Sequence, residues 1–288
     1  MANSCKYYKQ QKYVSYDSGL TWAPLEVYQK GDLYEQDSSD CGGGTTMYRT
    51  LEGTMCDDCA NDFKFINTTN VGQTYSVNCN SSTVIALSEV KNRNTIATST
   101  IGSCVTSIGD RAFQDCTNLN SVLIPSTVTS IDYAAFKGCQ NLLECAIPDS
   151  VTSIGDYAFS GCTQLTYINL PNNLTSLGKY AFAQCLNFSS INIPTTLTYI
   201  PQRCFFDCDG LSDIELHSGI TEIGSSAFAQ CSGLYTVKIF AETPPTLGSN
   251  VFGGSINNEL KILVPSNAVN TYKTAEGWSE YANKIFSI

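Results

Sequence analysis

The side chains that could do acid–base or nucleophilic chemistry are few. Histidine occurs once in the chain, at His217, so any Ser–His–Asp or Cys–His arrangement depends on one imidazole. We expect His217 at the exposed end of a strand. Asp213 and Glu215 are two positions apart, so on a strand both point to the same face. Paired carboxylates can cleave glycosidic bonds, but a flat strand offers no pocket around them, and we expect a solvated acidic patch without catalytic residues.

A C-x-x-C sequence, from Cys56 to Cys59, could bind a metal ion or form a redox pair. Zinc sites normally need a second close pair of ligands. The other cysteines of segment 1–80 are Cys5, Cys41 and Cys79, which are not closely paired. Zinc, a disulfide and plain thiols therefore stay open as alternatives, and five cysteines leave at least one unpaired within this segment. We predict no metal site and no cofactor.

Most of the remaining cysteines belong to a repeat, in which they recur at every 23rd position. Each follows a phenylalanine by three positions and an isoleucine or leucine by eight. The cysteines are Cys116, Cys139, Cys162, Cys185, Cys208 and Cys231, and the phenylalanines are Phe113, Phe136, Phe159, Phe182, Phe205 and Phe228. Cysteines of adjacent repeats point the same way, which makes the disulfide dihedral hard to reach. We therefore expect free, buried thiols that act as small hydrophobic groups.

A fixed period of this length is typical of a solenoid, in which each unit buries its apolar residues against its neighbours. Leu165, Ile168 and Leu170 have the L-x-x-I-x-L spacing of a short strand, and Pro171 ends it because proline cannot donate to the ladder. The segment 158–162 fits a short helical turn on the convex side. The predicted fold class is an α+β repeat solenoid, with short parallel strands and short convex helices, preceded by a small all-β domain.

The pattern T-S-I-G-x-x-A-F-x-x-C-x-x-L-x-x-I-x-I-P-x-x-V resembles the BspA-like leucine-rich repeat, a 23-residue subtype found on surface proteins of anaerobes and some protists. The resemblance covers residues 106–247. Four positions depart from it: Cys204 replaces Ala, Cys145 the strand Ile, His217 the Pro and Phe188 the Leu. The resemblance implies a binding protein without catalytic activity.

The period divides the chain into four segments. These are a small β-rich domain (1–80), a degenerate capping repeat (81–105), six repeats (106–247) and a C-terminal cap with a closing helix (248–288). The capping repeat keeps apolar residues in register at Ile85, Ile96, Ile101 and Val105, as expected for a terminal repeat that meets solvent or another domain. The helical spacing of the cap involves Val269, Tyr272, Trp278, Tyr281 and Ile285.

The segment 14–22 predicts a hairpin, since Asp17 can accept hydrogen bonds from turn amides and Gly19 tolerates a positive φ. Its S-x-D-x-G-x-T-W sequence resembles the Asp-box of sialidases and other propellers, in which the box is structural. A propeller needs several blades, and a sialidase an arginine cluster, whereas segment 1–80 contains only Arg49. We therefore expect a structural hairpin within a module that resembles small tandem β modules of gut bacteria and their phages.

The net charge is −10, with a pI near 4.5, and Lys and Arg together number only 16. Nucleic acids and anionic membranes attract basic surfaces, so neither is an expected partner. The chain has no continuous apolar run of the length that spans a membrane, and the segment 1–8 does not resemble a signal peptide. We expect no membrane insertion, and a location at the cell surface, outside the cell or in a virion.

The outward positions of the repeat strands should form a polar face, the usual binding surface of repeat proteins. The candidate ligand-binding residues are Ser121, Leu123, Glu144, Ala146, Tyr167, Asn169, Ser190, Asn192, Asp213, Glu215, Thr236 and Lys238. The sequence favours a non-enzymatic adhesion protein that binds a protein or glycan on a host or neighbouring cell. The alternative is a structural virion protein of a gut bacteriophage, in the tail, head fibre or decoration. In either case residues 1–80 could attach to a virion or surface scaffold.

Overall fold

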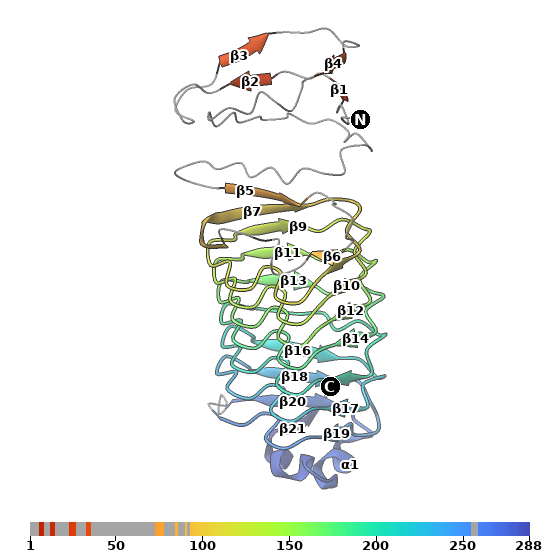
Figure 1. Cartoon of the computed structure of the whole chain (residues 1–288). Coiled ribbons are helices and arrows are strands. Elements are labelled where there is room, and N and C mark those ends of the chain that lie inside the picture. Colours follow the sequence, from red (N-terminus) through yellow and green to blue (C-terminus); the bar gives the residue numbers. More distant parts are fainter. Residues whose placement is uncertain are drawn as a thin grey trace.

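The computed structural model of the chain is an elongated parallel β-solenoid (Figure 1). It describes residues 84–85, 90, 93–254 and 259–288, and five strands nearer the N-terminus. These are β1 (Lys6–Tyr8), β2 (Lys12–Val14), β3 (Ala23–Glu26), β4 (Leu33–Glu35) and β5 (Gln73–Val77). β1 pairs with β4 and β2 with β3, both antiparallel. Residues 15–22 of the Asp-box-like segment, and Cys5, Cys41, Cys56, Cys59 and Cys79, lie outside the described residues.

One side of the solenoid is the long-strand sheet, to which successive coils contribute strands. Its strands are β5, β7 (Ile96–Ile101), β9 (Ser121–Leu123), β11 (Glu144–Ala146), β13 (Tyr167–Asn169), β16 (Asp213–Leu216), β18 (Thr236–Ile239), β20 (Lys261–Val264) and β21 (Ile285–Ser287). All pair in parallel, and the single bridges Tyr167–Ser190 and Asn192–Glu215 join β13 to β16 through the intervening coil. The outward side chains therefore form one continuous face.

The short strands lie on another side of each coil (Figure 1), in a five-stranded and a three-stranded sheet that we together call the short-strand sheet. Its strands are β6 (Val84–Ile85), β8 (Ser107–Ile108), β10 (Ser130–Ile131), β12 (Ser153–Ile154), β14 (Ser176–Leu177), β15 (Tyr199–Ile200), β17 (Glu222–Ile223) and β19 (Thr246–Leu247). Partners such as Ile131 and Ile154 are one repeat period apart. The last coils absorb insertions, because Glu222 pairs with Thr246 and Thr236 with Lys261. The strict period of the sequence thus gives way to longer coils that continue the stack.

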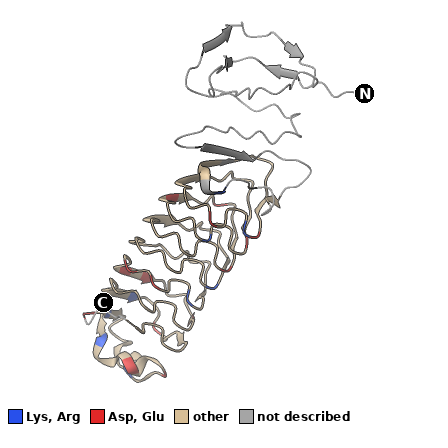
Figure 2. Cartoon of the chain, turned by 60° about the vertical axis from the view of Figure 1, so that its left-hand side comes forward, with Lys and Arg blue, Asp and Glu red and all other residues tan. Residues whose placement is uncertain are grey.

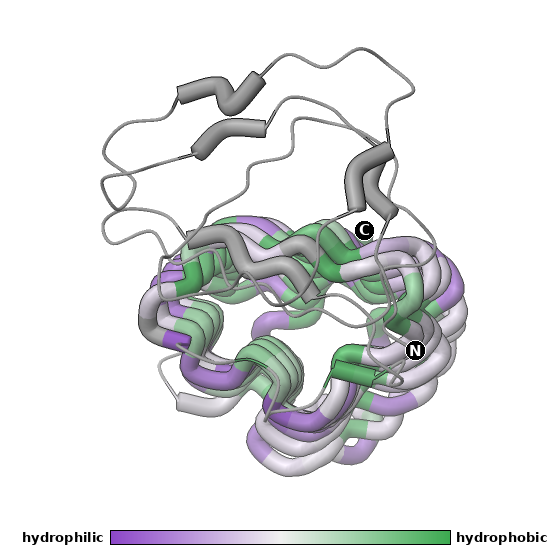
Figure 3. Tube along the Cα trace, turned by 45° about the horizontal axis from the view of Figure 1, so that its top comes forward, coloured by the Kyte–Doolittle hydropathy of each residue, from purple (hydrophilic) through white to green (hydrophobic). Residues whose placement is uncertain are grey.

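The core is built of columns that repeat from coil to coil, and Figure 3 shows hydrophobic positions of successive coils superposed in green. The repeat phenylalanines stack from Phe113 to Phe252, with centroids 5.2–5.8 Å apart and rings within 11° of parallel. Each such contact stabilises by about 0.5–1.5 kcal/mol beyond burial. The cysteine column is also buried, as predicted, and the Cys162 thiol donates to the Phe136 carbonyl of the preceding coil at 3.3 Å.

The predicted convex helices are wrong: in the described repeats these segments are hydrogen-bonded turns. Tyr157 has φ 60° and Gly161 has φ 75°, and right-handed helix requires negative φ. The Phe159 amide donates to the Ala181 carbonyl of the next coil at 2.8 Å, whereas the Ala158 amide donates within its own turn, to Gly155 at 3.3 Å. This alternation adds a ladder between coils and leaves no run of i to i−4 bonds for a helix.

The N-terminal coil keeps the apolar register that the sequence predicts, and Ile85, Ile96, Ile101 and Val105 are all buried. Arg93 occupies the column position of the cysteines. Its guanidinium Nη1 donates to the carbonyls of Arg111 (3.2 Å) and Gln114 (2.7 Å). Arg93 thus satisfies backbone acceptors of the first regular turn. β5 pairs with β7 beyond it, in parallel.

The C-terminal cap differs from the single closing helix that the spacing predicts. It consists of α1 (Val269–Thr274), a 3₁₀-helix (Trp278–Lys284) and then β21. Ile285 is in the strand because it pairs with Ile262 and so continues the buried column. The buried Trp278 indole donates to the Pro245 carbonyl at 2.7 Å, and the Tyr272 hydroxyl to the Ala241 carbonyl at 2.8 Å. These bonds fasten the cap to the last coil.

Candidate binding face

All the predicted ligand-binding residues lie on the outward side of the long-strand sheet or on the coil between β13 and β16, and none is buried. Side chains alternate along each strand, so the set forms two columns parallel to the solenoid axis. Column one is Ser121, Glu144, Tyr167, Ser190, Asp213 and Thr236, and column two is Leu123, Ala146, Asn169, Asn192, Glu215 and Lys238. We call this surface the strand face.

The N-terminal half of the strand face carries large apolar side chains. Leu123 is 62% exposed and Tyr167 is 53% exposed. Leu143, at the edge beside Glu144, is 50% exposed; it precedes the alternating part of its strand and was not predicted. Within the described part of the chain, the Tyr167 ring contacts no other ring or cation and its hydroxyl makes no hydrogen bond. An exposed tyrosine without intramolecular partners is available to a ligand.

The C-terminal half of the strand face is charged, and Figure 2 shows acidic (red) and basic (blue) positions on its strands. Lys238 Nζ lies 2.7 Å from Glu215 Oε1, and this hydrogen bond raises the pKa of Lys238. Lys261 Nζ donates to the Tyr235 hydroxyl at 3.0 Å and lies 5.1 Å from the centre of its ring. The sequence prediction missed Lys261 because the insertion before β20 shifts it out of period.

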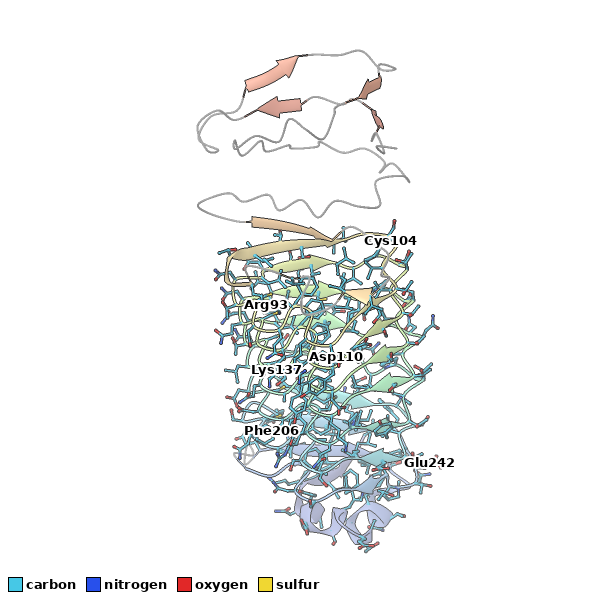
Figure 4. All side chains as sticks on the ribbon, viewed as in Figure 1. Arg93, Cys104, Asp110, Lys137, Phe206 and Glu242 are labelled. Atoms are coloured by element: carbon cyan, nitrogen blue, oxygen red, sulfur yellow. The ribbon has the colours of Figure 1, made fainter. Side chains whose placement is uncertain are left out.

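A row of tyrosine side chains lies on the convex turns, away from the strand face; Tyr133 is exposed, and Tyr157 and Tyr180 are half-buried. We call it the aromatic ladder, and it consists of Arg111, Tyr133, Tyr157, Tyr180 and Arg203. Arg111 lies 4.8 Å from the Tyr133 ring centre, Tyr157 stacks on Tyr180 at 4.5 Å, and Arg203 Nη1 donates to the Tyr180 hydroxyl at 2.6 Å. Lys137 and Phe206, labelled in Figure 4, add cation–π contacts with Tyr157 and Arg203. The rings and cations of the ladder contact one another across adjacent coils, so the ladder stabilises the convex turns.

The side chains considered above for catalysis lie on β16 or directly after it. His217 is half-buried, which corrects the expected exposure, because its Nδ1 accepts from the Gly219 amide at 3.1 Å and holds the ring against the turn after β16. Asp213 and Glu215 both point outward, as predicted, and Asp213 accepts from the Ser212 hydroxyl at 2.7 Å. Among the described residues, no three His, Cys, Asp or Glu side chains are grouped to hold a metal ion.

The described cysteines divide into two kinds. Eight are free and buried, including Cys145 and Cys204 in core positions. Burial raises the pKa of Cys145, Cys185 and Cys231 to about 12 from 9.0. Cys104, in contrast, is disulfide-bonded. It falls outside the cysteine column, and nothing in its spacing distinguished it.

Fold and strand face together define a class of protein: a leucine-rich-repeat β-solenoid with an open, outward strand face. A family model described as BspA type Leucine rich repeat region matches residues 83–165 and 133–259, in six copies. These ranges span more than half of the chain, which therefore belongs to this family. Within the described ranges, no helix is long and apolar enough to cross a membrane.

A solved structure supports the fold. It is a leucine-rich repeat protein from T. pallidum that is 23% identical, with 69% of this chain and 89% of that chain covered and a TM-score of 0.52. A leucine-rich repeat protein from Bacteroides ovatus is 23% identical, over 71% of this chain and 63% of that one, with a TM-score of 0.42. A leucine rich cell surface protein from Faecalibacterium prausnitzii is 19% identical, over 80% and 85%, with a TM-score of 0.29. A search of curated proteins finds no match.

Proposed function

We propose that this chain is a non-enzymatic, surface-displayed adhesion protein that binds a protein or glycan through its strand face. The observation that carries the proposal is the contrast between the tyrosines of the aromatic ladder and Tyr167 on the strand face. The rings and cations of the aromatic ladder contact one another, whereas Tyr167 is exposed on the strand face without a partner in the described residues. Tyrosine is among the residue types that most often contribute the largest share of affinity at interfaces.

The shape of the strand face supports binding of an extended surface. Its columns repeat at the spacing of parallel strands, about 4.8 Å, so a ligand that lies along the solenoid axis meets several coils at once. Asn169 and Asn192 stand in adjacent coils of column two, and both are exposed. Their amides both donate and accept hydrogen bonds. They therefore suit either a peptide backbone or sugar hydroxyls.

The test is binding of the fluorescently labelled full chain to cultured epithelial and bacterial cells, measured by flow cytometry. Asn192→Arg places a bulky side chain in the middle of the strand face and should reduce binding about tenfold or more. Ser176→Arg is the matched control, because Ser176 is also exposed but belongs to the short-strand sheet. Equal binding by the two variants, or no saturable binding to any cell, would contradict the proposal.

The virion alternative makes a separate prediction. Antibodies against the full chain should then label particles in electron micrographs of phage preparations from the source community, with attachment through residues 1–80. Labelling of cell surfaces instead of particles supports the adhesion protein.

A further inference from the structure

We propose that the strand face receives an arginine or lysine side chain of a protein partner over the exposed ring of Tyr167, with apolar neighbours of that residue against Leu123 and Leu143. This inference rests on the proposed function and adds the class of partner: a protein segment that combines basic and apolar side chains. It identifies the Tyr167 ring as the contact point on the strand face, and it requires a positive charge, which a neutral glycan lacks.

The position of Tyr167 in the register carries the first step. Glu144 pairs directly with Tyr167 on the adjacent strand, and Tyr167 bridges to Ser190 on the other side. Asp213 is the next member of column one. A carboxylate therefore stands one coil from the ring on one side and two coils from it on the other. At about 4.8 Å per coil, Glu144 is within reach of a cation that rests on the ring, and Asp213, about 10 Å along the axis, adds attraction from a longer distance.

The charge of the strand face carries the second step. Its cations lie in the C-terminal half and are already engaged, Lys238 with Glu215 and Lys261 with Tyr235. Glu144 makes no ion pair within the described residues, and Asp213 accepts only from Ser212 there. The surroundings of Tyr167 are therefore negative. The π face of a tyrosine attracts cations as well, so ring and carboxylates favour the same kind of group.

The chain itself shows that its tyrosines accept cations in this way. Arg111 covers Tyr133 at 4.8 Å, Lys137 covers Tyr157 at 5.3 Å and Lys261 covers Tyr235 at 5.1 Å. Tyr167 is more exposed than Tyr133 or Tyr235, but no basic side chain of the described residues lies over its ring. A cation from outside would complete the arrangement that the other tyrosines complete internally.

The apolar residues toward the N-terminal end of the strand face carry the third step. Leu143 precedes Glu144, one coil from Tyr167, and Leu123 lies in column two, two coils from Tyr167. Leu123 and Leu143 are exposed by half or more, and the loss of that surface from water favours binding by about 25 cal/mol per Å². A phosphate gains nothing from such contacts, and a sugar gains them only through the C–H face of its ring. A basic residue flanked by apolar residues in a protein segment matches the whole patch.

The experiment is a selection from a phage-displayed library of random linear peptides on the immobilised full chain, with Tyr167→Ala protein for counter-selection. Peptides that survive should contain Arg or Lys next to apolar residues. A labelled survivor should bind the wild type with an affinity that falls about tenfold in Tyr167→Ala and severalfold in Glu144→Gln. Tyr167→Phe keeps the ring and should retain most of the affinity. Tyr199→Ala is the control, because Tyr199 is exposed on the short-strand sheet.

Two results would overturn the inference. One is a set of surviving peptides without basic residues; the other is failure to recover any peptide that distinguishes wild type from Tyr167→Ala. A parallel array of neutral oligosaccharides separates the inference from the proposed function. Glycan binding that depends on Tyr167, without basic peptides, overturns the protein partner but leaves the strand face as the binding surface.

Discussion

At the scale of single residues, the cysteine column shows how a reactive group becomes a packing group. The thiols of Cys139, Cys162 and Cys185 donate to carbonyls of the preceding coil at 3.1–3.3 Å, and their side chains are fully buried. A thiol is small enough to fit between stacked coils and still donate a weak hydrogen bond. The period revealed the column and its burial, whereas the carbonyl acceptors follow only from the offset of adjacent coils.

The raised thiol pKa values predict alkaline instability. Burial raises the pKa of Cys185 to about 12 from 9.0, so between these values the unfolded chain loses the proton and the folded chain keeps it. Stability is therefore fully present below pH 9.0 and falls as the pH rises toward 12. Each such thiol lowers the free energy of unfolding by about 1.4 kcal/mol for each pH unit within this window.

Urea unfolding of wild type and Cys185→Ala at several pH values from 8 upward measures this effect. Cys185→Ala should be less stable at pH 8, by about 1–3 kcal/mol from lost packing, but its stability should fall less steeply above pH 9.0. Parallel slopes for the two proteins would show that Cys185 does not titrate in this window.

At the scale of elements, the strands of the long-strand sheet could be predicted from the sequence, whereas the short-strand sheet and the turns were not predicted. The alternation around Ile168 and the repeat period determine strand position, face and register. The convex turns require positive φ at Tyr157, Tyr180 and Arg203, which are residue types that also suit a helix. Glycine marks one of the turn positions with positive φ in three coils, at Gly138, Gly161 and Gly254, and was the available signal.

The turn geometry predicts that two glycines of neighbouring coils respond differently to alanine. Gly161 has φ 75°, and an added Cβ would have only ordinary contacts, 3.7 Å from Gly138, so Gly161→Ala should cost about 1–2 kcal/mol from backbone strain. At Gly178 an added Cβ would lie 2.3 Å from the Asp156 amide nitrogen, so the coils must separate. Gly178→Ala should cost more, and thermal unfolding of the two variants gives the order. A larger loss in Gly161→Ala would contradict this account of the turn.

The candidate site, too, could be predicted only in part from the sequence. The outward strand positions follow from alternation, and Tyr167 and Asn169 fall where it places them. Leu143 and Lys261 do not, since one precedes the regular strand and the other follows an insertion. Which exposed tyrosine is left without a partner depends on side-chain contacts between coils, and no pattern within one repeat reveals that.

At the scale of the whole molecule, the contacts that support the stack lie apart from the strand face that we propose for binding. Stacked phenylalanines, buried thiols and the aromatic ladder hold one coil on the next, and the strand face is left open along the stack. Attachment to a scaffold through residues 1–80 stays a prediction. Because β5 pairs in parallel with β7, the solenoid that the structure describes extends at its N-terminal end to Gln73.

Two tyrosines of the same repeat provide the most direct measurement of this separation. Tyr157 belongs to the aromatic ladder and Tyr167 to the strand face. The experiment compares Tyr157→Ala and Tyr167→Ala in the full chain. It measures the affinity of each variant for cells or selected peptides, and its thermal unfolding midpoint. Tyr167→Ala should lose about tenfold or more in affinity with little change in midpoint, and Tyr157→Ala should lower the midpoint and keep the affinity. Unchanged affinity in Tyr167→Ala, with lost affinity in a stable Tyr157→Ala, would contradict the assignment of the binding surface.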